Sequence, residues 1–338
     1  MKNFKFIISY DGSRYFGWER QPGRDTIQGK LEAVLTRMCG TDVQVIGAGR
    51  TDAGVHAKAM AANAYMDTER TPDEVRDYMN RYLPDDICVQ EAKLAADRFH
   101  ARYRAVGKLY TYTCYVGDTK PVFNRKYVTV LDYQPDLAAM QRAAEYLTGE
   151  HDYKSFCSNP QMKKSTVRIV DSIEIVRRKD LLYFNYHGTG FLQNMVRILT
   201  GTLLEVGQGK RTPESVKAAL EAKDRTQAGY TAPPQGLCLM RVETTDPTAA
   251  KRLPGRGAVS RGLTERLSQI CDCPMSPTAP SFPSCRKRRG RKGALGDAGC
   301  ILRLNLGRNL SFRRRSTRES PYVCLATRRL IRENQISK

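Results

Sequence analysis

The sequence of 338 residues has no apolar run that approaches the roughly 18 residues needed to cross a membrane. Its first ten residues carry Lys2 and Lys5, but the apolar stretch that follows them is too short for the hydrophobic region of a secretory signal peptide. We therefore expect neither membrane association nor export, and place the protein in the cytoplasm.

Acidic residues are few: the chain holds 35 Asp and Glu against 56 Lys and Arg. The resulting net charge of +21 points to a polyanionic partner. The excess of basic residues is unevenly distributed: residues 1–246 contain 35 basic and 30 acidic side chains, whereas residues 247–338 contain 21 basic and 5 acidic side chains. Hydrophobic residues make up 41% and charged residues 27%, near the globular average, which excludes a collagen-like or wholly disordered chain.

Cysteine spacing gives no sign of a disulfide framework or a zinc site. Five of the ten cysteines lie in the first 246 residues without close pairing. In the remaining segment Cys271, Cys273, Cys285 and Cys300 lack the CxxC spacing of zinc ligands. The pattern is typical of a reduced cytosolic chain with incidental thiols, and we expect no bound metal.

Residues 1–246 alternate between strand and helix patterns. Apolar alternation and β-branched runs predict strands at 4–8, 43–46, 58–66, 107–116, 167–176, 182–186 and 237–242. Helical spacing predicts helices at 27–38, 71–82, 137–147, 191–206 and from 212 onward. We predict an α+β protein of two lobes, residues 1–105 and 106–246. Each lobe has an antiparallel-type sheet with helices packed on one side, and a catalytic cleft lies between the lobes.

The last segment, residues 247–338, loses this periodicity. It contains 17 arginines but 4 lysines, and Ser, Pro, Gly and Cys replace regularly spaced apolar residues. Such a composition buries too little apolar surface to order itself, so we predict a disordered tail. One interpretation is a basic arm that holds RNA through its phosphates. The other, which we favour, is an extension read from an aberrant frame, because arginine has many codons in GC-rich sequence.

The most informative stretch is Gly47–His56, GAGRTDAGVH. It fits neither a dinucleotide fingerprint nor a phosphate-binding loop, since Asp52 and Val55 stand where glycine and lysine are required. It also lacks the HxE pattern of zinc deaminases and the GxSxG nucleophile elbow. What remains is an aspartate in a glycine-permitted loop, with Arg50 two residues away on the same side if the backbone is extended. A carboxylate oriented by a guanidinium suits a nucleophile or base, and a turn-capping aspartate is the alternative.

GAGRTDAGVHA resembles the catalytic loop of TruA-type tRNA pseudouridine synthases. Five further segments resemble this family in the same order: YDGSRYFGW (10–18), FHAR (99–102), KLYTY (108–112), GFLQNMVRILTGTLLEVG (190–207) and AKDRTQAGYTAPPQGLCL (222–239). The resemblance covers residues 3–245 and implies the pseudouridine synthase fold. Glu19 stands where the family often has glutamine.

The resemblance implies roles for individual residues. Asp52 matches the essential aspartate, which acts covalently on the target uridine before the base rotates and rejoins its sugar through carbon. Tyr110 matches the aromatic residue that packs on the target base and is proposed to act as general base. Arg197 matches the arginine that pairs with the catalytic aspartate, and Arg50 matches one proposed to help displace the base. Leu237 matches an apolar contact to the uracil.

Without the resemblance, the local sequence around these residues also fits structural roles. Tyr110 on an alternating strand also suits the core. Arg197, isolated on an apolar helix, needs a buried anionic partner, for which Asp52 is a candidate. His100 and Arg102 fit contacts to the RNA backbone and equally fit capping of a turn.

The function implied is isomerisation of uridine to pseudouridine in the anticodon stem-loop of tRNA, at tRNA positions 38, 39 and 40. The resemblance also implies a homodimer in which one tRNA spans both subunits, with no cofactor and no metal. The second hypothesis is a catalytically inactive RNA-binding protein of the same fold, against which the presence of Asp52 argues. A metal-dependent nuclease would require several clustered carboxylates, and only Asp42 and Asp67 lie near Asp52 in the sequence.

Overall fold

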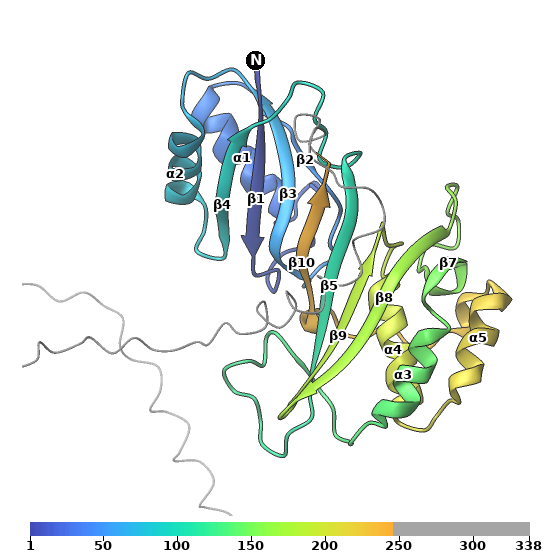
Figure 1. Cartoon of the computed structure of the whole chain (residues 1–338). Coiled ribbons are helices and arrows are strands. Elements are labelled where there is room, and N and C mark those ends of the chain that lie inside the picture. The colour runs from blue at the N-terminus through green and yellow to red at the C-terminus, as the bar shows by residue number, and fades with distance from the viewer. Residues whose placement is uncertain (246–338) are drawn as a thin grey trace, which may run out of the picture. The chain divides into compact units, whose positions relative to one another are not determined.

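The computed structural model describes residues 1–245 (Figure 1), so the predicted tail at 247–338 lies outside the described residues. Ten strands form one sheet with the order β4-β1-β3-β10-β5-β9-β8-β7, and β2 and β6 pair with β3 and β5. The strands are β1 (Lys2–Tyr10), β2 (Val45–Gly47), β3 (His56–Met66), β4 (Ile87–Leu94), β5 (Ala105–Tyr115), β6 (Thr129–Val130), β7 (Gly149–Asp152), β8 (Val167–Arg178), β9 (Leu181–Gly188) and β10 (Leu237–Thr244). The α-helices are α1 (Ile27–Cys39), α2 (Pro72–Tyr82), α3 (Leu137–Glu145), α4 (Met195–Gly207) and α5 (Pro213–Ala222).

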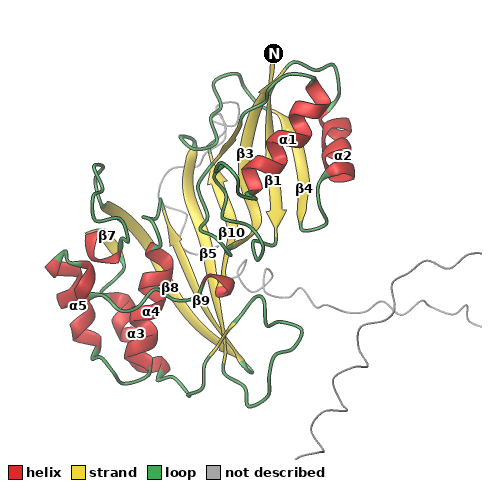
Figure 2. Cartoon of the chain, turned by 180° about the vertical axis from the view of Figure 1, so that it is seen from behind, coloured by secondary structure: helices red, strands yellow, loops and turns green. Residues whose placement is uncertain are grey.

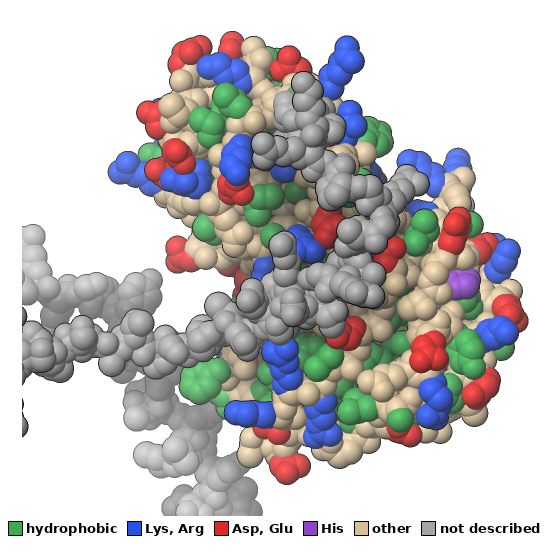
Figure 3. Space-filling view, in the orientation of Figure 1, with side chains coloured by type: hydrophobic (Ala, Val, Ile, Leu, Met, Phe, Trp, Pro, Cys, Tyr) green, Lys and Arg blue, Asp and Glu red, His purple; other side chains and the backbone are tan. Residues whose placement is uncertain are grey.

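The helices lie on one face of the sheet, the near face in Figure 2. α1 and α2 cover the end formed by β1, β3 and β4, while α3, α4 and α5 cover the end formed by β8 and β9. The opposite face, seen in Figure 3, carries basic and acidic side chains intermixed. This arrangement confirms the predicted α+β class with helices on one side.

The strands of the two predicted lobes join in a single sheet. β10 pairs in parallel with β3 through Cys238 and Leu239, and antiparallel with β5 along its length. A segment from the end of the described chain therefore connects the strand that follows the Asp52 loop to the strand that carries Tyr110. The boundary near residue 105 stays a prediction.

The first two helices begin where their capping residues predict. The Thr26 hydroxyl accepts a hydrogen bond from the Gly29 amide at 3.3 Å, and α1 ends at Gly40, whose φ of 72° lies in the left-handed region. At α2, Thr71 and Glu74 form the predicted capping box with Pro72 at the first helical position. Both ends satisfy backbone groups that a helix leaves unpaired, which fixes these boundaries locally.

Helix α4 begins later than its apolar pattern predicts. The pattern starts at Phe191, but the helix starts at Met195 because Asn194 has a left-handed φ of 57°. Phe191 instead packs edge-on against the Tyr110 ring, with centroids 5.3 Å apart. The four residues before the helix therefore form part of the surroundings of Tyr110.

Candidate active site

The loop that carries Asp52 is held by the segment that follows β1. The Trp18 amide donates to the Thr51 carbonyl at 3.0 Å, and the Tyr10 and Thr51 hydroxyls are hydrogen-bonded at 2.8 Å. The Trp18 indole packs so closely on Gly47 that a Cβ there would lie 2.6 Å from the ring. These contacts fix the backbone on the N-terminal side of Asp52.

Two glycines allow this close packing. A Cβ at Gly12 would collide with the Val55 carbonyl oxygen, and one at Gly17 would lie 2.7 Å from the Thr51 carbonyl oxygen. Directly after Asp52 the chain turns, with the Val55 amide donating to the Asp52 carbonyl at 3.1 Å. The segments YDGSRYFGW and GAGRTDAGVH therefore interlock as one unit.

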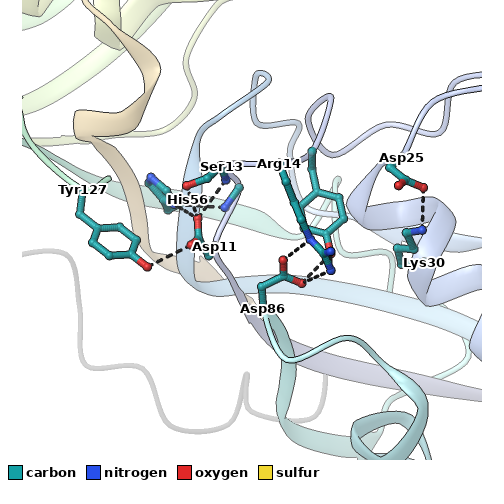
Figure 4. Close-up of polar contacts among 10 residues, drawn as sticks. Asp11, Ser13, Arg14, Asp25, Lys30, His56, Asp86 and Tyr127 are labelled. Carbon is teal, nitrogen blue, oxygen red and sulfur yellow. Dashed lines mark hydrogen bonds and ion pairs between the residues drawn. The ribbon is translucent and has the colours of Figure 1, made fainter. Parts of the chain in front are cut away.

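A polar cluster anchors the start of this unit (Figure 4). The Asp11 carboxylate accepts from the Ser13 amide at 2.9 Å and from the Tyr127 hydroxyl at 3.0 Å. The Gly12 amide donates to Nδ1 of the buried His56 at 3.1 Å, and burial lowers the pKa of this histidine. His56 thus packs at the turn.

Asp52 and Arg197 meet across the sheet. Arg197 Nη1 lies 3.5 Å from Asp52 Oδ2, and the two side chains are 15% and 31% exposed. Arg197 Nε donates to the Ala232 carbonyl at 2.7 Å, and Nη1 donates to Asn194 Oδ1 at 2.8 Å. The isolated arginine of α4 therefore has the buried anionic partner that the sequence predicts.

Opposing influences set the charge of Asp52. Burial raises the pKa of its carboxyl above the usual value, and the positive charge of Arg197 offsets part of that increase. Loss of water destabilises the ionised form, whereas the guanidinium stabilises it. The result is a half-buried carboxylate with one fixed cationic neighbour, which is a suitable state for a nucleophile.

Tyr110 lies beside this pair on β5. Its side chain is 7% exposed, and burial followed by the nearby negative charge of Asp52 raises the pKa of its phenol well above the usual range. Within residues 1–245 its hydroxyl makes no hydrogen bond to another side chain. Leu237 is buried on β10 opposite Tyr112, and Leu239 lies opposite Tyr110 itself. Asp52, Arg197 and Tyr110 therefore lie together, and Leu237 lies on the neighbouring strand opposite Tyr112.

Arg50 differs from the expectation based on an extended backbone. Its side chain is 57% exposed and its guanidinium pairs with Glu19, whereas the guanidinium beside Asp52 belongs to Arg197. A spacing of two residues therefore does not pair these two side chains, because each has its charged partner in another segment. Arg50 is instead available at the surface next to the site.

His100 and Arg102 lie in the turn before β5. The His100 carbonyl accepts from the Tyr103 and Arg104 amides at 3.1 and 3.0 Å, and its ring packs on Tyr103. His100 Nδ1 is buried without a hydrogen-bond partner in the described part of the chain. Arg102 is exposed and its guanidinium lies near Lys108, a residue that the sequence patterns do not single out.

Within the part of the chain that the structure describes, His, Cys, Asp and Glu form no group of three or more suited to hold a metal ion. No helix among residues 1–245 is both long enough and apolar enough to cross a bilayer.

The family follows from comparison with known proteins. A family model described as tRNA pseudouridine synthase matches residues 6–104 and 143–244. The chain therefore belongs to the tRNA pseudouridine synthase family, a family of isomerases.

Individual relatives carry the more particular name tRNA pseudouridine synthase A, which confirms the TruA-type resemblance. The enzyme of Bacillus sp. (strain KSM-64) is 45% identical over 231 residues, which are 68% of this chain and 95% of the relative. That of Clostridium kluyveri is 41% identical over 242 residues, covering 72% of this chain and 99% of the relative. That of Geobacillus sp. (strain WCH70) is 44% identical, covering 71% and 98%.

Proposed function

We propose that this protein converts uridine to pseudouridine in the anticodon stem-loop of tRNA, at tRNA positions 38, 39 and 40, with Asp52 as the nucleophile. The observation that supports this most directly is the contact of 3.5 Å between the half-buried Asp52 carboxylate and Arg197, beside the phenol of Tyr110. Family membership supplies the class of reaction.

The proposed reaction begins when the target uridine leaves the RNA stack, at a cost of a few kcal/mol. The Asp52 carboxylate then forms a covalent bond to the nucleotide. The bond between uracil N1 and the sugar breaks, the base rotates, a bond forms between C5 and the sugar, and the bond to Asp52 breaks, which returns the free carboxylate. Arg197 keeps Asp52 ionised and oriented before the attack, because its own position is fixed by Asn194 and the Ala232 carbonyl.

Tyr110 would pack on the uracil, lose its phenolic proton to water during the reaction, and accept the C5 proton at the end. Before substrate binds, burial and the Asp52 charge raise the pKa of Tyr110, so its phenol is protonated at neutral pH. Once Asp52 is bonded to the nucleotide its negative charge is gone, and that contribution to the raised pKa disappears. While the covalent bond to Asp52 lasts, the pKa of Tyr110 is therefore lower, and the phenolate that can accept a proton forms more readily.

The remaining residues would handle the displaced base. Leu237, buried beside Tyr112, offers an apolar contact to the uracil. Arg50, exposed next to the site, would fill or hold the position that the base leaves in the stack. His100 and Arg102 would contact the RNA backbone near the target.

Release of tritium from a tRNA transcript labelled at uridine C5 tests the proposal. The intact protein should release tritium without added metal or cofactor, and Asp52→Asn should reduce the rate by at least about 10³-fold while tRNA affinity changes only a few fold. The exposed control Asp42→Asn should behave as the intact protein. If Asp52→Asn still turns over, or the intact protein binds tRNA without releasing tritium, the proposal is wrong.

Two further properties belong to this proposal. We propose that the protein acts in the cytoplasm and that it is a homodimer in which one tRNA contacts both subunits. Light scattering of the free protein and of its tRNA complex tests the second statement. Two protein chains for each bound tRNA are expected.

A further inference from the structure

Lys108 is a half-buried lysine on the active-site face of β5, two residues before Tyr110. In the sheet it lies opposite Gly188 of β9 and Val242 of β10. Its ammonium reaches the Asp52 loop, because a Cβ placed on Gly49 would lie only 2.8 Å from Lys108 Nζ. The lysine thus connects the strand of Tyr110 to the loop of the nucleophile.

Two arginines from other parts of the chain share this location. Arg102, in the turn before β5, and Arg168, on β8, both act on the charge of Lys108. Arg168 also packs along Gly190, the residue before Phe191, with its Cδ and Nε 3.9 Å from the position of a Cβ there. Three cations therefore lie close to one another, with Lys108 at the Asp52 loop and Arg168 at the residue before Phe191.

No carboxylate neutralises this group. Among residues 1–245 Lys108, Arg102 and Arg168 form no ion pair, and Arg168 Nη1 donates only to the carbonyls of Ser165 and Val167. Burial, together with the two arginines, lowers the pKa of Lys108 to about 8. Holding like charges together in partial burial is unfavourable unless an anion joins them.

We propose that Lys108, Arg102 and Arg168 bind one backbone phosphate of the substrate RNA next to the target uridine. The inference rests on the proposed function, since that function supplies the RNA. A phosphate suits the site because its several oxygens accept charge-assisted hydrogen bonds from ammonium and guanidinium groups at once. Gly49 leaves room for this, and Lys108 is then a positioning residue that sets the nucleotide over Tyr110 and Asp52.

The test pairs a change in the protein with a change in the RNA. Anticodon stem-loops are made with one neutral methylphosphonate in turn at each phosphate flanking the target, and binding is measured for the intact protein, Lys108→Met and Lys108→Arg. Lys217→Met, an exposed lysine of α5, is the matched control. Because Arg102 is exposed, Arg102→Gln supplies the same comparison without disturbing the interior.

We expect one methylphosphonate to weaken binding to the intact protein about tenfold, and Lys108→Met to weaken binding of unmodified RNA similarly. When the two changes are combined, binding should be weakened no more than by either change alone, because both remove the same interaction. Lys108→Arg should retain most of the affinity. Additive losses at every flanking phosphate, for both Lys108→Met and Arg102→Gln, would overturn the inference.

Tritium release separates this inference from the proposed function. An intact protein that converts uridine but shows additive losses disproves the phosphate site alone. An intact protein that converts no uridine, yet shows the non-additive loss at one phosphate, disproves the proposed function and supports the site.

Discussion

Asp52 shows most clearly how neighbouring residues set the chemistry of a side chain. Burial raises the pKa of its carboxyl, and Arg197 opposes that change. Arg197→Lys removes the oriented guanidinium, so the pKa should rise further and the carboxylate should form only at higher pH. The acid limb of the single-turnover rate should move to higher pH, with the rate at neutral pH about 100-fold lower.

The control for this prediction is Arg211→Lys. Arg211 pairs with Glu205 at 3.2 Å, in a comparably buried ion pair that does not touch Asp52. Its pH profile should match that of the intact protein. A profile for Arg197→Lys that keeps the original acid limb would show that Arg197 does not stabilise the charge of Asp52.

The same raised pKa has a consequence for stability. Because the folded state binds the Asp52 proton more tightly than the unfolded chain does, stability falls as pH rises from the unfolded to the folded pKa. At neutral pH the ionised carboxylate thus destabilises the fold, and Asp52→Asn should raise the melting temperature. At a pH below both the folded and the unfolded pKa of Asp52, this gain in melting temperature should vanish. An equal gain at both pH values, or a gain of the same size from the exposed control Asp42→Asn, would contradict this origin.

Lys108 predicts a pH dependence of RNA binding. Its ammonium faces Arg102 and Arg168, and the other titratable groups on its face of β5, Tyr110, Tyr112 and Cys114, have raised pKa values and remain protonated in this range. With a pKa of about 8, Lys108 loses its positive charge as pH rises through that value, so RNA affinity should fall between neutral pH and pH of about 9. Lys108→Arg, which stays charged, should abolish this fall in a filter-binding titration.

At the scale of elements, the interlocked unit of residues 10–18 and 47–56 determines where Asp52 lies. Gly12→Ala places a methyl group against the Val55 carbonyl oxygen, which is backbone and has little freedom to move. We expect a loss of about 1–3 kcal/mol in the free energy of unfolding, together with a lower rate of tritium release.

Gly23→Ala is the matched comparison for Gly12→Ala. Its φ of 69° also disfavours alanine, but a Cβ there meets no atom within 4 Å. Denaturant unfolding should show a smaller loss for Gly23→Ala, and tritium release should be unchanged. Equal activity of Gly12→Ala and Gly23→Ala would show that the packing of residue 12 does not position Asp52.

Element boundaries were predictable where local chemistry sets them. Thr26, Gly40 and the Thr71 capping box fix helix ends through contacts with their immediate neighbours, and these ends are confirmed. Strand β4 was not predicted, because its pattern alternates only weakly and it forms by pairing with β1, more than 70 residues away in the chain. The start of α4 was placed too early because Phe191 continues the apolar spacing although it belongs to the site.

The candidate site was predictable where a residue conflicted with its local pattern. Arg197 stands among apolar residues and therefore needed a distant partner, which the structure supplies. Lys108 gave no such signal, because a lysine on a strand is ordinary until the fold brings Arg102, Arg168 and Gly49 beside it. The pairing of Arg50 with Glu19 joins two segments of the chain that are far apart in sequence, which a spacing rule does not capture.

At the scale of the whole molecule, most of the excess positive charge and the candidate site lie in different parts of the chain. All residues assigned to the site lie within 1–245, whereas residues 247–338 hold 21 basic and 5 acidic side chains. A chain ending at Asp246 should therefore keep its tritium-release rate under saturating tRNA within about twofold, since no group that touches the target is removed. Loss of that rate on truncation would assign a catalytic contribution to the removed segment.

The position of β10 also determines when activity can arise during synthesis. Residues 237–244 are the last of the described chain to leave the ribosome, yet they lie in the middle of the sheet, between the strand after the nucleophile loop and the strand of Tyr110. Until that strand emerges, the two parts of the active site have no shared framework. If the proposed site is correct, a nascent chain should therefore gain activity only after β10 has left the ribosome and paired with β3 and β5.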